Sequence, residues 1–169
     1  MMRYIIIALF LQFPLISFAQ QKDSITVYYF LGEDCKICQY YTPTMIELHD
    51  KYNSKDLSFV GLFPNHFSSP DSIDVFKEKY DIPFTVKKEF FLTKTKLFDI
   101  KVTPEVVVYN ETTKEVLYKG RIDNSYYKLG RRRQVITSKE LDDVLALIEQ
   151  GEKVDIPSAP PIGCFISFR

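Results

Sequence analysis

The 169-residue chain has few residues for cysteine or metal chemistry: it contains three Cys, two His and no Trp. Three cysteines are too few to hold a chain of this length together as a disulfide-rich miniprotein. Acidic and basic side chains are equal in number, 22 of each, which argues against a nucleic-acid-binding module with its usual basic excess. The length suits one globular domain with a sizeable core. The odd number of cysteines, two of them close together, is the most informative feature.

The first 19 residues have the features of a secretory signal peptide. Arg3 provides a positive charge, residues 4–18 are mostly apolar, and Ser17-Phe18-Ala19 places small residues at the two positions that a signal peptidase reads. A retained membrane anchor is the weaker interpretation, because a bilayer span needs about 20 apolar residues and this stretch contains Pro14. We expect cleavage after Ala19 and a periplasmic or otherwise exported protein of near-neutral charge, with no stable membrane insertion.

Segments typical of strands and helices alternate along the mature chain. Runs of β-branched and aromatic residues predict strands, and apolar residues spaced by three and four predict helices. Strands are expected at 25–31, 57–63, 104–109 and 115–119, and helices at 35–52, 69–82, 90–100 and 137–150. A capping box at Thr137-Ser138-Lys139-Glu140 should begin the last helix, after a polar, basic loop at 123–133. The pattern predicts an α/β domain at 20–154 and a Pro-rich C-terminal tail at 155–169.

A cysteine pair, Cys35-Lys36-Ile37-Cys38, follows the first predicted strand at the point where a helix begins. The free N–H groups at a helix N-terminus stabilise a thiolate, which is the nucleophile in disulfide exchange. A second cysteine one turn later can attack a mixed disulfide and release the product. The charge of Lys36 favours the thiolate, whereas Glu33 and Asp34 oppose it, so the sequence leaves the pKa of Cys35 open.

Two other uses of this pair stay open, a zinc half-site and an inert structural disulfide. Structural zinc usually has four ligands, and the other Cys and His residues, Cys164, His49 and His66, form no second close pair. A copper site at Met45 and His49 is a further alternative, but an ordinary surface histidine is favoured there. We therefore expect no metal and no cofactor.

Two prolines make the chain resemble the thioredoxin superfamily. Pro43 lies five residues after Cys38, where thioredoxin-like proteins carry a proline within the active-site helix. Thr103-Pro104, followed by the strand at 106–109, is similar to the cis-proline segment of that family. The resemblance implies a thioredoxin-like fold, with a central mixed β-sheet flanked by helices. It also implies a helix–strand–helix insert, within residues 64–100, between the helix of the cysteine pair and the cis-proline strand.

The same resemblance implies an exported thiol–disulfide oxidoreductase whose partners are protein disulfides or dithiols. In such a protein Cys35 attacks the substrate and Cys38 resolves the mixed disulfide. Thr103 and Pro104 present backbone to the substrate polypeptide, and Ile37 shapes the surface between the cysteines. Exported relatives imply a membrane-bound thiol electron donor and substrates such as apocytochromes or other exported proteins with disulfides.

A narrower resemblance, carried by residues 118–123 and 163–166, is to bacterial redoxin-domain proteins near the alkyl hydroperoxide reductase and thiol-specific antioxidant family. Two positions depart from the wider pattern. Tyr29 stands six residues before Cys35, where many thioredoxins bury an acid, and Gly32 stands where peroxide-splitting members carry Thr or Ser. The alternative functions are a thiol peroxidase, against which Gly32 argues, and a non-enzymatic metal- or partner-binding module on the same fold.

Cys164 is the remaining, unpaired cysteine. It follows the proline-rich stretch 157–161, which is expected to be extended and can run back across the domain. Two interpretations are open. Cys164 is either a small, partly buried residue of the tail or a third redox thiol near the active site.

Overall fold

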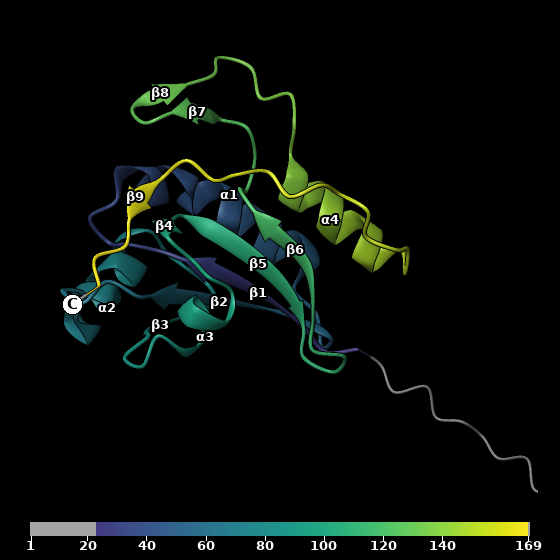
Figure 1. Cartoon of the computed structure of the whole chain (residues 1–169), viewed down its shortest axis with the longest axis horizontal. Helices are drawn as coiled ribbons and strands as arrows, with labels where there is room; N and C mark the ends of the chain where they lie inside the picture. The colour runs from purple at the N-terminus through teal and green to yellow at the C-terminus, as the bar shows by residue number, and fades with distance from the viewer. Residues whose placement is uncertain (1–22, 169) are drawn as a thin grey trace, which may run out of the picture.

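The computed structural model describes residues 23–168, so the predicted signal peptide and its cleavage site lie outside the described residues. A five-stranded mixed sheet, in the order β3-β2-β1-β5-β6, forms the centre of the molecule (Figure 1). Its strands are β1 (Ile25–Phe30), β2 (Leu57–Phe63), β3 (Thr85–Lys88), β5 (Glu105–Asn110) and β6 (Glu115–Gly120). The helices are α1 (Lys36–Tyr52), α2 (Pro70–Lys79), α3 (Thr93–Leu97) and α4 (Glu140–Glu149). β1 pairs in parallel with β2 and antiparallel with β5.

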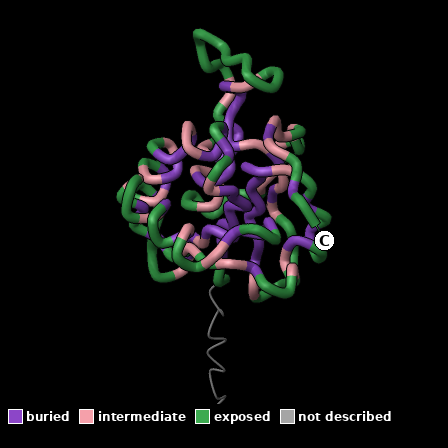
Figure 2. Tube along the Cα trace, turned by 90° about the vertical axis from the view of Figure 1, so that its left-hand side faces the viewer, coloured by how far each residue is buried: buried purple, intermediate pink, exposed green. Residues whose placement is uncertain are grey.

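The central strands are buried on both faces, because successive side chains of a strand point to opposite sides of the sheet. In β1, Val27 and Tyr29 belong to one apolar cluster, whereas Tyr28 and Phe30 belong to the other. The first cluster includes buried residues of α1, α2 and α4, and the second includes Phe98 from the end of α3. Figure 2 shows the buried core enclosed by exposed helices and loops. The sheet is therefore a rigid support for the loops at its edges.

The insert between α1 and the cis-proline segment has the predicted order, α2, β3 and α3. The hydroxyl of Ser69 accepts the N–H of Ser72 at 3.1 Å, and the Ser72 hydroxyl accepts the N–H of Ser69 at 3.0 Å. This reciprocal cap starts α2 where the sequence predicts it. α3 covers only part of the predicted 90–100 helix, because the Glu89 carboxylate accepts the N–H groups of Lys94 and Thr95 and fixes the start of the helix there.

Residues 123–133 do not form the predicted polar loop. Their first three residues are buried, and the carboxylate of Asp123 accepts the hydroxyl of Tyr41 and the N–H of Ser125, both at 2.7 Å. The following residues form a ribbon of two short strands, β7 (Tyr126–Lys128) and β8 (Arg131–Arg132), which projects from the body of the molecule (Figures 1 and 2). The sequence pattern showed the polar character of this segment but not the buried partner of Asp123.

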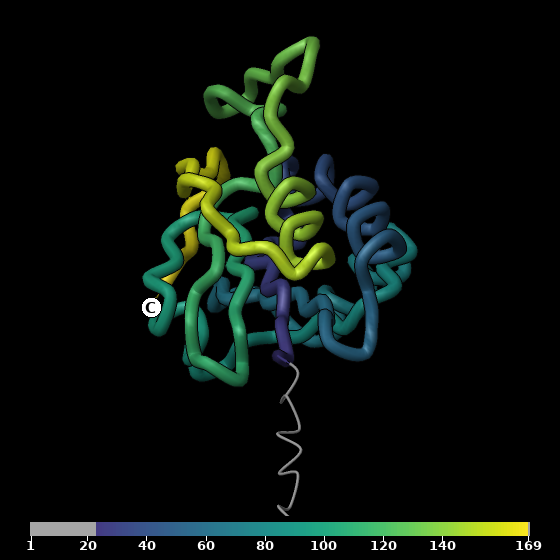
Figure 3. Tube along the Cα trace, turned by 90° about the vertical axis from the view of Figure 1, so that its right-hand side faces the viewer, coloured from purple at the N-terminus to yellow at the C-terminus, as the bar shows by residue number. Residues whose placement is uncertain are grey.

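The chain after α4 returns across the molecule and ends in β9 (Cys164–Phe165) (Figure 3). β9 pairs antiparallel with β4 (Val102–Thr103), and Cys164 lies opposite Thr103. Ile162 and Cys164 pack against the first apolar cluster, and Ile166 is buried in the second. The tail therefore takes part in the packing and brings the end of the chain to the strand that precedes Pro104.

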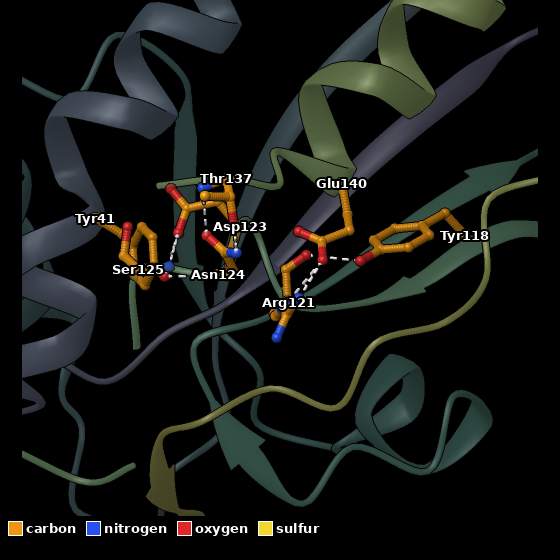
Figure 4. A network of polar contacts seen from close by, with 8 residues as sticks. All are labelled: Tyr41, Tyr118, Arg121, Asp123, Asn124, Ser125, Thr137 and Glu140. Atoms are coloured by element: carbon orange, nitrogen blue, oxygen red, sulfur yellow. Dashed lines mark hydrogen bonds and ion pairs between the residues drawn. The ribbon is translucent and has the colours of Figure 1, made fainter. Parts of the chain in front are cut away.

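The predicted capping box at the start of α4 does not form. The side chain of Asn124 exchanges two hydrogen bonds with Thr137: its amide donates to the Thr137 hydroxyl at 2.7 Å, and its oxygen accepts the Thr137 N–H at 3.1 Å (Figure 4). Thr137 is thus bound to the buried segment below the ribbon. α4 begins three residues later at Glu140, and Lys139 at its N-cap makes no side-chain cap.

Candidate active site

The turn after β1 places Cys35 at the N-cap of α1. Its backbone is extended, and its carbonyl accepts the N–H of Gln39 at 3.0 Å as the helix begins. The sulfur of Cys35 therefore lies at the positive end of a 17-residue helix. Cys38 follows one turn later, is fully buried, and accepts the N–H of Gly32 at 3.4 Å on its sulfur. Pro43 lies within the same helix, as predicted.

The pKa values of the two cysteines shift in opposite directions. A hydrogen bond from the Cys38 side chain is the leading cause that lowers the pKa of Cys35 to about 5, against the opposing effect of burial. The Cys164 side chain and the N–H groups of Cys38 and Ile37 also stabilise the thiolate. Burial raises the pKa of Cys38 well above its ordinary value, and the neighbouring Cys35 raises it further. At neutral pH the pair is thus one thiolate and one thiol.

Lys36 and Glu33, two charged neighbours of Cys35, form hydrogen bonds with other residues. The ammonium group of Lys36 donates to Gln39 at 3.1 Å in an exposed contact. The carboxylate of Glu33 accepts the hydroxyls of Ser68 at 2.7 Å and Ser72 at 2.9 Å, so it is bound to the start of α2. Hydrogen bonds from Cys38, Cys164 and the first backbone N–H groups of α1, rather than these charges, lower the pKa of Cys35.

The Thr103–Pro104 peptide bond is cis, as the resemblance implies, and it lies beside the cysteine pair. When Cys35 is protonated, its thiol donates to the carbonyl oxygen of Thr103 at 3.3 Å. Thr103 is fully buried, and its strand is paired with β9. The backbone that we expected to receive a substrate polypeptide is therefore paired with the tail of the chain itself.

All three cysteines come together at this point, and none of them is in a disulfide. Gly163 lies so close to Thr103 that a Cβ atom added to it would overlap the Thr103 carbonyl oxygen. The next side chain, Cys164, contacts Cys35; burial and then this contact raise the pKa of Cys164 to about 12. The sequence showed only that a glycine precedes Cys164, which carries no signal by itself. The need for glycine appears once β9 is paired with β4.

Two residues near the cysteines lie in surroundings that the sequence did not predict. Ile37, expected to shape the surface between the cysteines, is only 5% exposed and packs in the first apolar cluster. Tyr126, at the base of the ribbon, lies against the rings of Tyr40 and Tyr41, with centroid distances of 5.3 and 6.0 Å. Tyr126 is close enough for the charge of Cys35 to act on its pKa, which burial raises first. This contact was not predicted from the sequence, because Tyr126 lies in a predicted loop.

The two departures from the thioredoxin pattern have structural consequences. Tyr29 is fully buried against Phe59 and Phe84, and burial raises its pKa, so that it stays protonated. Its hydroxyl has no hydrogen-bond partner within residues 23–168. At Gly32 a Cβ atom would lie 3.1 Å from the Asn65 amide nitrogen, so there is little room for Ser or Thr. Neither Tyr29 nor Gly32 therefore provides a carboxylate to the cysteines, and Gly32 provides no hydroxyl.

The two histidines make contacts with residues other than the cysteines. His49 lies 3.0 Å from the carboxylate of Asp50, and His66 lies 3.2 Å from the carbonyl oxygen of Ser167. In the part of the chain that the structure describes, no group of three or more His, Cys, Asp or Glu residues could hold a metal ion.

Alkylation of the reduced protein by iodoacetamide is expected to show a midpoint near pH 5 at Cys35. The pKa is lowered and the thiolate is the nucleophile, so the rate should stay constant above the midpoint and fall about tenfold per pH unit below it. Mass spectrometry of the Cys35 peptide after timed quenching measures the rate. Cys35→Ser provides the background from the other two cysteines, and a midpoint at the ordinary cysteine value would contradict the expected stabilisation.

A cysteine pair that opens a helix after a central strand, beside a cis-proline that precedes an antiparallel strand, defines a thioredoxin-like site on a thioredoxin-like fold. No protein-family model and no curated protein sequence matches the chain. Solved structures do match it. An uncharacterized conserved protein from Geobacillus kaustophilus has a TM-score of 0.76 at 22% identity, over 88% of this chain and 79% of that chain.

Two further structures support the same fold. The hypothetical protein SMc02350 from Sinorhizobium meliloti 1021 has a TM-score of 0.75 at 18% identity, over 88% of this chain and 81% of that one. A secreted Mycobacterium tuberculosis disulfide oxidoreductase homologous to E. coli DsbE has a TM-score of 0.53 at 16% identity, over 73% of this chain and 81% of that one. The predicted fold class is thus confirmed, and the chain is thioredoxin-like.

Proposed function

We propose that the protein is a thiol–disulfide oxidoreductase that exchanges electrons with protein disulfides and dithiols. The observation that carries this proposal is the unequal cysteine pair, with a stabilised Cys35 thiolate at the start of α1 and a buried Cys38 thiol one turn later. The description of the Mycobacterium tuberculosis protein as a disulfide oxidoreductase agrees with it. The closeness of the pair to Thr103 and Pro104 places an extended backbone segment beside the nucleophile.

In the first step the Cys35 thiolate attacks one sulfur of a substrate disulfide. A bond forms between Cys35 and that sulfur, and the second substrate sulfur leaves as a thiolate. The hydrogen bonds from Cys38, Cys164 and the backbone keep Cys35 ionised without a carboxylate base. This agrees with the presence of Tyr29 where many thioredoxins bury an acid.

In the second step Cys38 attacks the sulfur of Cys35. The Cys35–Cys38 bond forms, and the substrate sulfur leaves as a thiolate that can take the proton lost by Cys38, so the substrate gains two electrons and the protein loses two. Burial is the main cause that raises the pKa of Cys38, and the charge of Cys35 adds to it. Once Cys35 is in a neutral mixed disulfide that charge is gone. Cys38 therefore becomes easier to ionise only after the substrate is captured, which orders the two steps.

The proposal includes export, on the strength of the predicted signal peptide at 1–19. A membrane-bound thiol donor and exported proteins with disulfides are the partners that this location would offer. No helix within residues 23–168 is long and apolar enough to cross a membrane. N-terminal sequencing of the protein recovered from the extracytoplasmic fraction tests export, and we expect it to start at Gln20. Recovery in the cytosol with residues 1–19 attached would contradict it.

Reduction of insulin disulfides by dithiothreitol tests the proposed activity. The wild-type protein should accelerate precipitation of the insulin B chain, and the double variant Cys35→Ser/Cys38→Ser should give the rate of dithiothreitol alone. Faster consumption of hydrogen peroxide that depends on Cys35, without insulin reduction, would favour a thiol peroxidase. Tight copper or zinc binding that needs both cysteines, without turnover, would favour a binding module.

A further inference from the structure

Cys164 lies at the nucleophile through contacts that all converge on one residue, Thr103. The Thr103 carbonyl oxygen accepts the thiol of Cys35 at 3.3 Å, and in the β4–β9 ladder Cys164 lies directly opposite Thr103. Gly163 is pressed against the same carbonyl group, with no space for a side chain. The side chains of Cys35 and Cys164 are in contact. The nucleophile thus has two thiol neighbours, Cys38 on its own helix and Cys164 on the tail.

The tail is attached on both sides of Cys164. Before it, the carbonyl oxygen of Ala159 accepts the N–H of Arg121 at 3.0 Å. After it, the N–H of Ile166 donates to the carbonyl oxygen of Lys101 at 3.0 Å, and the Ile166 side chain is buried. The position of Cys164 is therefore set by the packing of the chain on both sides of it, and does not depend on the sulfur contact alone.

Cys38 and Cys164 differ in their access to solvent. Cys38 is fully buried, whereas Cys164 is partly exposed at the edge of β9. Once Cys35 is part of a neutral disulfide, its negative charge no longer opposes the ionisation of either thiol. Burial then opposes ionisation more strongly at Cys38 than at Cys164, because Cys164 keeps part of its contact with water. This gives Cys164 a route to attack Cys35 in competition with Cys38.

We propose that Cys164 is a second exchange partner of Cys35, an inference that rests on the proposed oxidoreductase function. In a mixed disulfide between Cys35 and a small thiol, which leaves β9 in place, the Cys164 thiolate attacks the sulfur of Cys35 in competition with Cys38. The Cys35–Cys164 bond forms, the bond from Cys35 to the small thiol breaks, and that sulfur leaves as a thiolate that can take up the proton that Cys164 has lost. The protein loses two electrons and the small disulfide that formed the adduct gains them, so that disulfide is the oxidant.

The consequence is a form of the protein in which its own tail occupies the edge of β4. An extended polypeptide that pairs with the edge of β4 would take the place of β9, because strand addition needs a free edge. A disulfide between Cys35 and Cys164 fixes β9 on that edge and uses the nucleophile. In this form the protein holds its own tail where a substrate strand would pair, and Cys38 stays a thiol.

Oxidation of the variant Cys38→Ser by glutathione disulfide tests the proposal. Cys35 attacks glutathione disulfide and releases one glutathione; Cys164 then attacks Cys35 and releases the second, so the two electrons lost by the protein pass to glutathione disulfide. We expect an internal Cys35–Cys164 disulfide, seen as the loss of two hydrogens in the intact mass and as a cross-linked peptide after digestion. The matched control Cys38→Ser/Cys164→Ser should instead stop at the glutathione adduct of Cys35.

A second variant tests the position of the tail. Gly163→Ala in the Cys38→Ser background keeps all reacting sulfurs but introduces a methyl group where the Thr103 carbonyl lies, and closure of the disulfide should slow by about tenfold. Circular dichroism checks that this variant is folded. Persistence of the glutathione adduct in Cys38→Ser, at the level of the double variant, would overturn the proposal. Insulin reduction by the wild type would be unaffected by that outcome, so the failure of this inference differs from failure of the proposed function.

Discussion

Replacement of Cys35 by Ser is expected to lower insulin reduction to the rate of dithiothreitol alone, at every pH where the wild type is active. A serine hydroxyl is not ionised at these pH values and does not attack disulfides, whereas Cys35 is a thiolate above about pH 5. Neither Cys38 nor Cys164 can take over the role. Neither lies at the N-cap of α1, and burial, the leading cause, raises the pKa of both.

Cys38→Ser is the matched variant, and it should behave differently. Release of the first substrate thiol in a single turnover should persist, because Cys35 is still present, but steady-state turnover should fall because the main resolving thiol is lost. The pKa of Cys35 should also rise, since Cys38 supplies the leading hydrogen bond that lowers it. Activity equal to that of the wild type in either Cys35→Ser or Cys38→Ser would contradict the assigned roles.

Arg121→Met is expected to lower the free energy of unfolding by about 2–3 kcal/mol at pH 7, because it leaves the carboxylate of Glu140 without its cation. The Arg121 guanidinium donates from Nε to Glu140 at 2.9 Å, and a second guanidinium nitrogen contacts the same oxygen (Figure 4). The Glu140 side chain is 9% exposed and that of Arg121 25%, so the effect should be smaller than for a fully buried pair. Denaturation by urea, followed by circular dichroism, measures it.

The pH dependence of this variant has a definite sign. Burial, the largest single cause, would raise the pKa of Glu140, but the hydrogen bonds from Arg121, Ser138 and the backbone, together with the charge of Arg121, lower it. A lowered carboxylate pKa contributes stability that is present above the unfolded value and is lost as the pH falls through the folded value. The stability difference between wild type and Arg121→Met should therefore shrink as the pH falls below the ordinary glutamate pKa of 4.5. A double-mutant cycle with Glu140→Gln isolates the pair, and a difference independent of pH would contradict this explanation.

Much of the site follows from signals close together in the sequence. The strand before Cys35, the helix that begins there and the start of α2 after Ser69 all depend on neighbouring residues, so periodicity and capping rules predict them. The cis bond before Pro104 followed from the resemblance to thioredoxins, and the structure has it. Where these local rules failed, the side chain concerned is hydrogen-bonded to a residue elsewhere in the chain. Thr137 does not cap α4 because it is bound to Asn124, and the segment after β6 is buried because Tyr41 holds Asp123.

The amino-acid sequence by itself determined which residues could carry the chemistry, namely three cysteines, and that two of them open a helix. Only the tertiary structure decided that Cys164 joins them, because β9 pairs with β4, a strand about sixty residues earlier in the chain, and this pairing brings Cys164 to Cys35. It also decided the pKa of Cys35. That value depends on hydrogen bonds whose directions are set by packing, whereas the nearby charges visible in the sequence are bound elsewhere.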